Sequence, residues 1–211
     1  MNELILICAS AIVGYLLGSI PTAVWIGKAY YNIDVRDHGS KNAGATNTFR
    51  VLGKKPGTIV LIIDVLKGII ASIFPIIFDQ FILLDYSFLI ALRLISSIFS
   101  MIGHVLPVFA QFKGGKGVAT SLGVLIGLQP LAAMICFSIF LLIFILSKYV
   151  SLGAILSAFL YPFIVYVVDS KVIFLEMIFT VILSAAVIFT HRKNIIRLIK
   201  GEENKMNLFK R

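Results

Sequence analysis

The sequence contains few acidic residues and few cysteines. Its 211 residues include 10 Asp and Glu against 19 Lys and Arg, and only 2 cysteines. Cys8 and Cys136 lie in apolar runs without a CxxC spacing or a histidine at ligand spacing, which argues against a disulfide framework and a zinc site. The acids are also too scattered to form a site for a hard cation. We therefore expect no metal and no cofactor.

Charge of either sign is scarce, whereas long apolar runs are abundant. Hydrophobic residues make up 59% of the chain and charged residues 14%, and the mean hydropathy is +1.01. This composition lies outside the range of soluble domains and predicts an all-α, polytopic membrane protein. The N-terminus carries Glu3 and no basic residue before its first apolar run, so we expect this run to be retained as a helix rather than removed as a signal peptide.

Because a membrane-crossing helix needs ~20 mainly apolar residues, the long apolar runs predict six spans. These spans are residues 4–26, 57–78, 87–109, 131–147, 151–168 and 172–190. A further apolar stretch at 117–129 has about 20 Å of helix, which is short for a bilayer unless the bilayer thins or the helix tilts. A proline-induced turn at Gln129 and Pro130 would make this stretch a crossing of its own.

The distribution of basic residues decides between the topologies. The segment 28–55 holds six Lys and Arg, and the tail from residue 191 to the end holds seven. If 117–147 were a single span, or 111–129 a re-entrant loop, these segments would lie on opposite sides, against the positive-inside rule. We therefore predict seven transmembrane helices, with the N-terminus outside and the C-terminus cytoplasmic, in a single integral-membrane domain of residues 1–211.

The first unusual polar segment is DVRDHGSKNAGATNTFR, residues 34–50. It supplies hydroxyl and amide groups between two arginines, and its glycines permit conformations that turn backbone N–H groups toward a ligand. Such a segment suits a phosphate or an oxyanion. For one loop taken alone, a solvated connector whose Ser, Thr and Asn cap helices and turns is the competing interpretation.

The second polar segment is GHVLPVFAQFKGGKGVAT, residues 103–120. Its glycines allow close approach of the backbone, its lysines add charge, and the helix after Gly117 would offer its N-terminal dipole to an anion. It is not a Walker A loop, because that pattern requires glycine in place of Ala110 and Ser or Thr in place of Gly117. A flexible positive-inside loop is the competing interpretation.

The third polar segment is HRKNIIRLIKGEE, residues 191–203, which begins where the last predicted span ends. His191 and Asn194 are three residues apart and share one face if the helix continues. A juxtamembrane basic helix attracted to anionic lipid is an equally good interpretation. Within the second span, Asp64 and Lys67 are also three apart and are predicted to pair, and charges inside a membrane are candidates for functional residues.

Taken together, the three polar segments carry many cationic and neutral donors and few acids, which predicts an anionic ligand rich in oxygen. A site at a membrane surface can take one substrate from water and another from lipid. The pattern H-x-x-x-x-D is absent, because Ala43, Phe109 and Ile196 stand where it requires aspartate. A His/Asp dyad is therefore not expected.

These three segments, in this order and at these predicted membrane boundaries, resemble the bacterial acyl-phosphate-dependent glycerol-3-phosphate acyltransferase family. The resemblance implies a seven-helix enzyme that transfers a fatty acyl group from acyl phosphate to glycerol 3-phosphate. The products are 1-acylglycerol 3-phosphate (lysophosphatidic acid) and phosphate, an early step of phospholipid biosynthesis. It also implies a bacterial plasma-membrane location, an active site on the cytoplasmic side, two substrates and the bilayer as partners, no nucleic acid and no obligate protein partner.

The family motifs also imply the site residues. The catalytic candidates are Ser40, Asn42, Thr46 and His191. The candidates for substrate binding are Gly39, Asn47, Arg50, Lys113, Gly114, Gly115, Lys116, Ser151 and Asn194. The residues leave open which of the two lysines contacts phosphate, and whether His191 or a substrate phosphate oxygen accepts the proton.

Lys41 departs from the family pattern, since glycine is expected at its position. If this position needs a positive φ, the lysine is strained. A membrane carrier of phosphorylated metabolites is the alternative function. Carriers usually place their cationic site near the midplane between repeated halves, whereas no repeat is present here.

Overall fold

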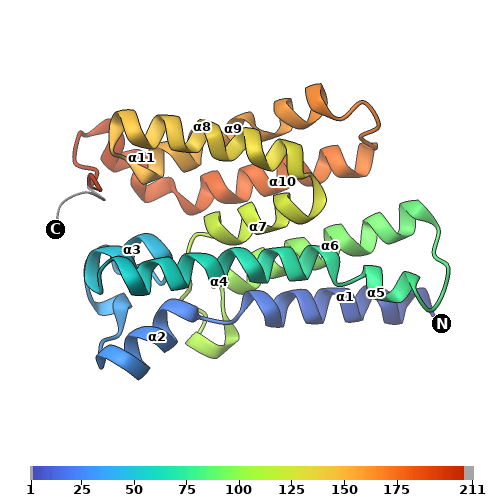
Figure 1. The fold of residues 1–211 in the computed structure, drawn as a ribbon, viewed down its shortest axis with the longest axis horizontal. Helices are drawn as coiled ribbons and strands as arrows, with labels where there is room; N and C mark the ends of the chain where they lie inside the picture. Colours follow the sequence, from blue (N-terminus) through green and yellow to red (C-terminus); the bar gives the residue numbers. More distant parts are fainter. Residues whose placement is uncertain (1, 207–211) are drawn as a thin grey trace. The chain divides into compact units, whose positions relative to one another are not determined.

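The computed structural model describes residues 2–206, and all regular secondary structure in this range is helical (Figure 1). The chain divides into two compact units, Met1–Leu128 and Gln129–Arg211. Lys210 and Arg211, which were counted among the basic residues of the tail, lie outside the described residues.

Five helical segments of the described chain are long and apolar enough to cross a membrane: Glu3–Tyr31, Lys54–Asp79, Tyr86–Ala110, Pro130–Ser147 and Val150–Val168. A bent pair, Phe174–Thr190 with Arg192–Ile199, raises the number to six if it is one span. Between 22% and 50% of each apolar window is buried in the protein, which leaves apolar side chains on the outside for lipid. The protein is thus an all-helical, polytopic membrane protein, as its composition predicts.

The first unit contains seven α-helices and two short 3₁₀ turns among its described residues. The helices are α1 (Glu3–Gly18), α2 (Thr22–Tyr31), α3 (Ala45–Val51), α4 (Lys54–Ile73), α5 (Ile76–Asp79), α6 (Tyr86–Val105) and α7 (Val118–Leu128), and the turns are η1 (Val35–Asp37) and η2 (Val108–Ala110). Helices α1, α4 and α6 run side by side, and α2 and α3 lie toward the end of this unit that is remote from the N-terminus (Figure 1).

The predicted spans 4–26 and 57–78 each lie within one candidate membrane span, but each contains a break in the helix. The span 4–26 breaks between α1 and α2 at Pro21, whose φ of -90° and ψ of 67° are not helical. The span 57–78 breaks at Pro75, between α4 and α5. Proline has no N–H to donate to the preceding turn, which explains both interruptions.

Small residues bring α1 and α6 into close contact. A Cβ atom added at Gly14 would collide with the main chain of Ser96, and one added at Gly18 would collide with the main chain of Ser100. Close backbone approach through small residues is the usual way in which membrane helices associate, because lipid offers no hydrophobic driving force between them.

The second unit consists of α8 (Pro130–Ser147), α9 (Val150–Val168), α10 (Phe174–Thr190) and α11 (Arg192–Ile199). The helix break predicted at Gln129 and Pro130 is present, since α7 ends at Leu128 and α8 begins at Pro130. The predicted spans 151–168 and 172–190 correspond to α9 and α10, and the bounds differ by no more than two residues.

Pro162 lies inside α9 without leaving a carbonyl unpaired. Its missing N–H deprives the carbonyl of Ala158, four residues earlier, of the usual helical donor. The hydroxyl of Ser184, in α10, donates a hydrogen bond of 2.6 Å to this carbonyl oxygen. A proline is tolerated here because the neighbouring helix replaces the lost bond.

Candidate active site

The first polar segment is folded by an ion pair between Asp34 and Arg36. Asp34 Oδ2 lies 2.7 Å from Arg36 Nη2, and Asp34 Oδ1 accepts a 2.9 Å bond from Arg36 Nε and a 3.0 Å bond from its main-chain N–H. The hydrogen bonds from Arg36 hold the pKa of Asp34 well below its usual range, although partial burial opposes this. The carboxylate therefore stays ionised at any working pH.

Arg36 also ties the first polar segment to the second. Its Nη1 donates a 2.8 Å hydrogen bond to the main-chain carbonyl of Ala110, in η2. Two loops that are 74 residues apart in the sequence are thereby fixed side by side within the first unit.

Asn47, at the start of α3, closes the first polar segment on itself. It is 1% exposed, and its Nδ2 donates to the carbonyls of Val35 at 2.7 Å and His38 at 3.1 Å. Its Oδ1 accepts from the main-chain N–H of Ser40 at 2.8 Å and from the Ser40 hydroxyl at 3.1 Å. The amide of Asn47 is therefore occupied in holding this loop and in orienting Ser40.

Lys41 has a φ of 57°, so the strain that its departure from glycine predicts is present. Gly39, two residues earlier, also has a positive φ, of 58°. Two left-handed residues therefore flank Ser40 and turn the chain sharply around it. The other predicted residues of this segment follow Ser40: Asn42 and Thr46 are half-buried, and Arg50 lies in the last turn of α3.

The glycine loop, Lys113–Gly117, folds back along the end of α6. The N–H of Gly114 donates to the carbonyl of Val105 at 3.2 Å, and the N–H of Gly115 donates to the carbonyl of His104 at 3.0 Å. Gly117, with a φ of 81°, precedes α7. Lys113 is exposed and Lys116 is half-buried.

The predicted pairing of Asp64 and Lys67 is confirmed, with Lys67 Nζ 2.9 Å from Asp64 Oδ1. The hydroxyl of Thr22 donates to the same oxygen at 3.3 Å, and Lys67 Nζ donates to the carbonyl of Ile20 at 3.1 Å. Ile20 lies at the break between α1 and α2, so its carbonyl is available to accept a hydrogen bond from the buried Lys67 ammonium.

The third polar segment forms a helix of its own, α11, and is not a straight continuation of α10. A bend of 59° separates α10 from α11, and His191 is the residue at the bend. His191 is 3% exposed, and its Nδ1 lies 2.8 Å from the carbonyl of Val187. Because a carbonyl only accepts, Nδ1 carries a proton, and a neutral ring then has its lone pair on Nε2.

Glu203 binds Ser151 and Asn194, the two predicted substrate-binding residues of the second unit. No role was predicted for Glu203 itself. Its Oε1 accepts from the Ser151 hydroxyl at 2.9 Å and from Asn194 Nδ2 at 2.7 Å, and its Oε2 lies 2.7 Å from Arg197 Nε. Burial by itself raises the pKa of Glu203, but the hydrogen bonds from Arg197, Asn194 and Ser151 outweigh it and lower the pKa. The signal available in the sequence was the acidic pair that ends the third segment.

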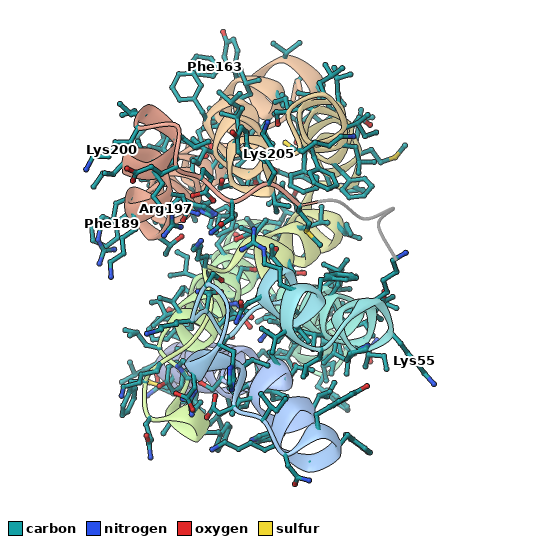
Figure 2. All side chains as sticks on the ribbon, turned by 90° about the vertical axis from the view of Figure 1, so that its left-hand side faces the viewer. Lys55, Phe163, Phe189, Arg197, Lys200 and Lys205 are labelled. Carbon is teal, nitrogen blue, oxygen red and sulfur yellow. The ribbon has the colours of Figure 1, made fainter. Side chains whose placement is uncertain are left out.

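The surface of α11 is strongly basic. Lys200, which follows the helix, points away from the ribbon of this unit, and Arg197 lies nearer the chain that carries Glu203 (Figure 2). Arg192 stacks on the ring of Phe189, with its guanidinium carbon 4.5 Å from the ring centroid. Asn194 and Arg197 thus bind α11 to Glu203, whereas Ile196 and Ile199 are exposed beside the basic side chains.

The fold and these segments define an integral membrane protein whose polar loops are rich in hydrogen-bond donors. Residues 8–201 match the sequence profile of the glycerol-3-phosphate acyltransferase family. The glycerol-3-phosphate acyltransferase of Fusobacterium nucleatum subsp. nucleatum is 46% identical over 191 residues, which are 90% of this chain and 93% of that protein. The corresponding protein of Staphylococcus carnosus is 41% identical over 197 residues, covering 92% and 95%.

Two crystal structures of PlsY (YgiH), an integral membrane glycerol 3-phosphate acyltransferase, resemble the whole chain. The glycerol 3-phosphate form has a TM-score of 0.84 at 36% identity, covering 97% of this chain and 99% of that one. The lysophosphatidic acid form has a TM-score of 0.80 at 35% identity, covering 96% of each chain. The chain belongs to the glycerol-3-phosphate acyltransferase family, and the assignment made from the three polar segments is confirmed.

Proposed function

We propose that this protein transfers a fatty acyl group from acyl phosphate to glycerol 3-phosphate, with release of phosphate and lysophosphatidic acid. The acceptor and the product are supported by the two forms in which PlsY was crystallised. The observation that carries the proposal is the hydrogen bond between Arg36 and the Ala110 carbonyl. It joins two loops that are rich in hydrogen-bond donors and poor in free carboxylates. Two substrates that each carry a phosphate need such donors, because carboxylates would repel them.

The first polar segment holds the acyl phosphate in this proposal. The hydroxyls of Ser40 and Thr46, the amide of Asn42 and the backbone near Gly39 bind the phosphate and the oxyanion that forms at the acyl carbonyl. Asn47 keeps the Ser40 hydroxyl in place through its two bonds to that residue.

The glycine loop binds the phosphate of the acceptor. Gly114 and Gly115 allow close approach, and the N-terminus of α7 favours negative charge. Of the two lysines, the half-buried Lys116 is better placed to hold an ordered phosphate than the exposed Lys113, because a solvated ammonium is screened. Arg50, Ser151 and Asn194 complete the proposed substrate-binding residues.

The chemistry needs positioning more than acid catalysis, because phosphate is already a good leaving group. The 1-hydroxyl oxygen of glycerol 3-phosphate attacks the acyl carbonyl carbon, and the carbon–oxygen bond to phosphate then breaks. The hydroxyl proton passes to His191 Nε2 or to a substrate phosphate oxygen, whose second pKa near 6 suits the transfer.

The whole chain acts as one acyltransferase domain with seven crossings, in which α7 counts as a short span. The positive-inside rule supports this topology, since it places the three polar segments on the cytoplasmic side with the N-terminus outside. The bacterial plasma membrane is the corresponding location.

A comparison of acyl donors tests the proposal. The purified protein is supplied with glycerol 3-phosphate and either palmitoyl phosphate or palmitoyl-CoA, and lysophosphatidic acid is measured by mass spectrometry together with released phosphate. We expect product and phosphate in equal amounts from the acyl phosphate alone. Product from palmitoyl-CoA but not from palmitoyl phosphate would refute the proposed donor, and no product from either would refute the reaction.

A further inference from the structure

A buried polar cluster lies directly under the glycine loop and has no part in the mechanism above. Its members are Asp64, Lys67 and His104, which are 2%, 4% and 6% exposed. Together with Thr22 they line one small pocket, and Ala43, Gly114 and Gly115 are among the other residues of its wall. The cluster therefore shares a pocket with the first polar segment and lies against the glycine loop.

The histidine ring links the buried carboxylate to the loop. His104 Nδ1 lies 3.8 Å from Asp64 Oδ1. The opposite ring nitrogen, Nε2, faces Gly115, where an added Cβ atom would collide with the ring. The His104 carbonyl also accepts the N–H of Gly115 at 3.0 Å. The position of this ring thus limits how deep the loop can sit.

The ion pair holds the ring from below. Lys67 and Asp64 are bound to each other and to Thr22 and the Ile20 carbonyl, so neither side chain can move without leaving a buried polar group unpaired. A fixed carboxylate restricts the imidazole on one side, and the loop backbone restricts it on the other.

We propose that Asp64, Lys67 and His104 are positioning residues that set the height of the glycine loop and thereby the affinity for the acceptor phosphate. This inference rests on the proposed role of the glycine loop in binding glycerol 3-phosphate. The cluster does not touch the reacting atoms, so it acts on KM for the acceptor more than on kcat.

The two neighbouring glycines provide a matched test. An alanine at Gly115 collides with the His104 side chain, whereas an alanine at Gly114 collides with the main chain of His104 and Val105. Gly115→Ala and His104→Ala should each raise KM for glycerol 3-phosphate about tenfold or more. The double variant should have the KM of His104→Ala alone, because the colliding ring is gone. With Gly114→Ala the two effects should multiply, because the main chain remains.

The ion pair is tested by a neutral replacement, Asp64→Asn with Lys67→Met, which leaves no uncompensated charge. We expect KM for glycerol 3-phosphate to rise about tenfold and kcat to change less than threefold. Ser97→Ala is the control, because Ser97 is buried in the same helix as His104. Its hydroxyl donates to the Arg93 carbonyl of its own helix and not to the cluster. This variant should leave KM unchanged.

A second readout does not depend on catalysis. Trypsin cleavage after Lys113 and Lys116 reports the loop conformation, and it should become at least threefold faster in His104→Ala while the Ser97→Ala control is unchanged. Unaltered cleavage and unaltered KM in His104→Ala would overturn the inference. Faster cleavage with an unaltered KM would leave the loop support intact but refute the loop's proposed role in acceptor binding.

Discussion

The side-chain oxygen of Asn47 accepts two hydrogen bonds from Ser40, one from its main-chain N–H at 2.8 Å and one from its hydroxyl at 3.1 Å. The donor side of the same amide is bound to the carbonyls of Val35 and His38. A single buried side chain therefore connects the turn before Ser40 with the residue itself. Asn47 thus holds the Ser40 hydroxyl, which we propose as a substrate-binding group, in place.

Replacing Asn47 by leucine should reduce both activity and stability. The variant removes both bonds to Ser40 and the amide donor to the Val35 and His38 carbonyls, each of which keeps one main-chain donor. Each lost hydrogen bond costs about 0.5–1.5 kcal/mol. We expect kcat/KM to fall roughly 100-fold and the unfolding temperature to drop by several degrees. Ser40→Ala is the comparison: it should lose a similar share of activity with little change in unfolding temperature. An Asn47→Leu protein with normal activity would contradict the positioning role.

Lys41→Gly should stabilise the protein. A lysine at a φ of 57° carries a cost of about 1 kcal/mol that glycine avoids. We expect a higher unfolding temperature for Lys41→Gly and no gain for Lys41→Ala, which removes the same charge but keeps the Cβ atom. Equal stabilisation by both substitutions would assign the effect to charge instead of backbone strain.

The carboxylate of Glu203 should make stability depend on pH. Because its pKa is lower in the folded protein than the usual value of about 4.3, the ionised form stabilises the fold above that pH. This contribution disappears as the pH falls through the lowered pKa. Glu203→Gln should therefore lower the unfolding temperature at pH 7, and the difference from the unsubstituted protein should shrink below pH 4.

The neighbouring residue supplies the control for this prediction. Glu202 is exposed, whereas Glu203 is 9% exposed and accepts three side-chain hydrogen bonds. Glu202→Gln should leave the unfolding temperature unchanged at both pH values. A difference between Glu203→Gln and the unsubstituted protein that stays constant from pH 7 to well below pH 4 would show that the carboxylate charge is not what stabilises this region.

His191→Gln separates the two possible proton acceptors. The bond from Nδ1 to the Val187 carbonyl holds the tautomer in which Nε2 can accept a proton. As general base, His191 should account for a loss of roughly 100-fold or more in kcat, with a smaller change in KM for glycerol 3-phosphate. A change confined to KM would assign the proton to a substrate phosphate oxygen and leave His191 a binding role.

Much of the helix layout could be predicted because it depends on local properties. Apolar runs of membrane length set the positions of α8, α9 and α10, and proline at position 130 sets the start of α8. The strain at Lys41 was also foreseeable, since it depends on one residue type at one position. Pro21 and Pro75 likewise indicate the helix breaks before α2 and α5, but these prolines lie inside long apolar runs that were each predicted as one helix.

The supporting contacts could not be predicted, because they join residues far apart in the chain. Glu203 meets Ser151 across 52 residues, and Arg36 meets Ala110 across 74. No periodicity marks such pairs. The bend at His191 was not predicted either, because the sequence there continues a helical pattern.

The binding constant of glycerol 3-phosphate, measured by calorimetry in the absence of acyl donor, tests the central claim most directly. The claim is that the glycine loop holds the acceptor phosphate through Lys116. We expect Lys116→Ala to weaken binding at least tenfold and Lys113→Ala, at the exposed lysine of the same loop, to weaken it less than threefold. Unchanged affinity in Lys116→Ala would contradict the account.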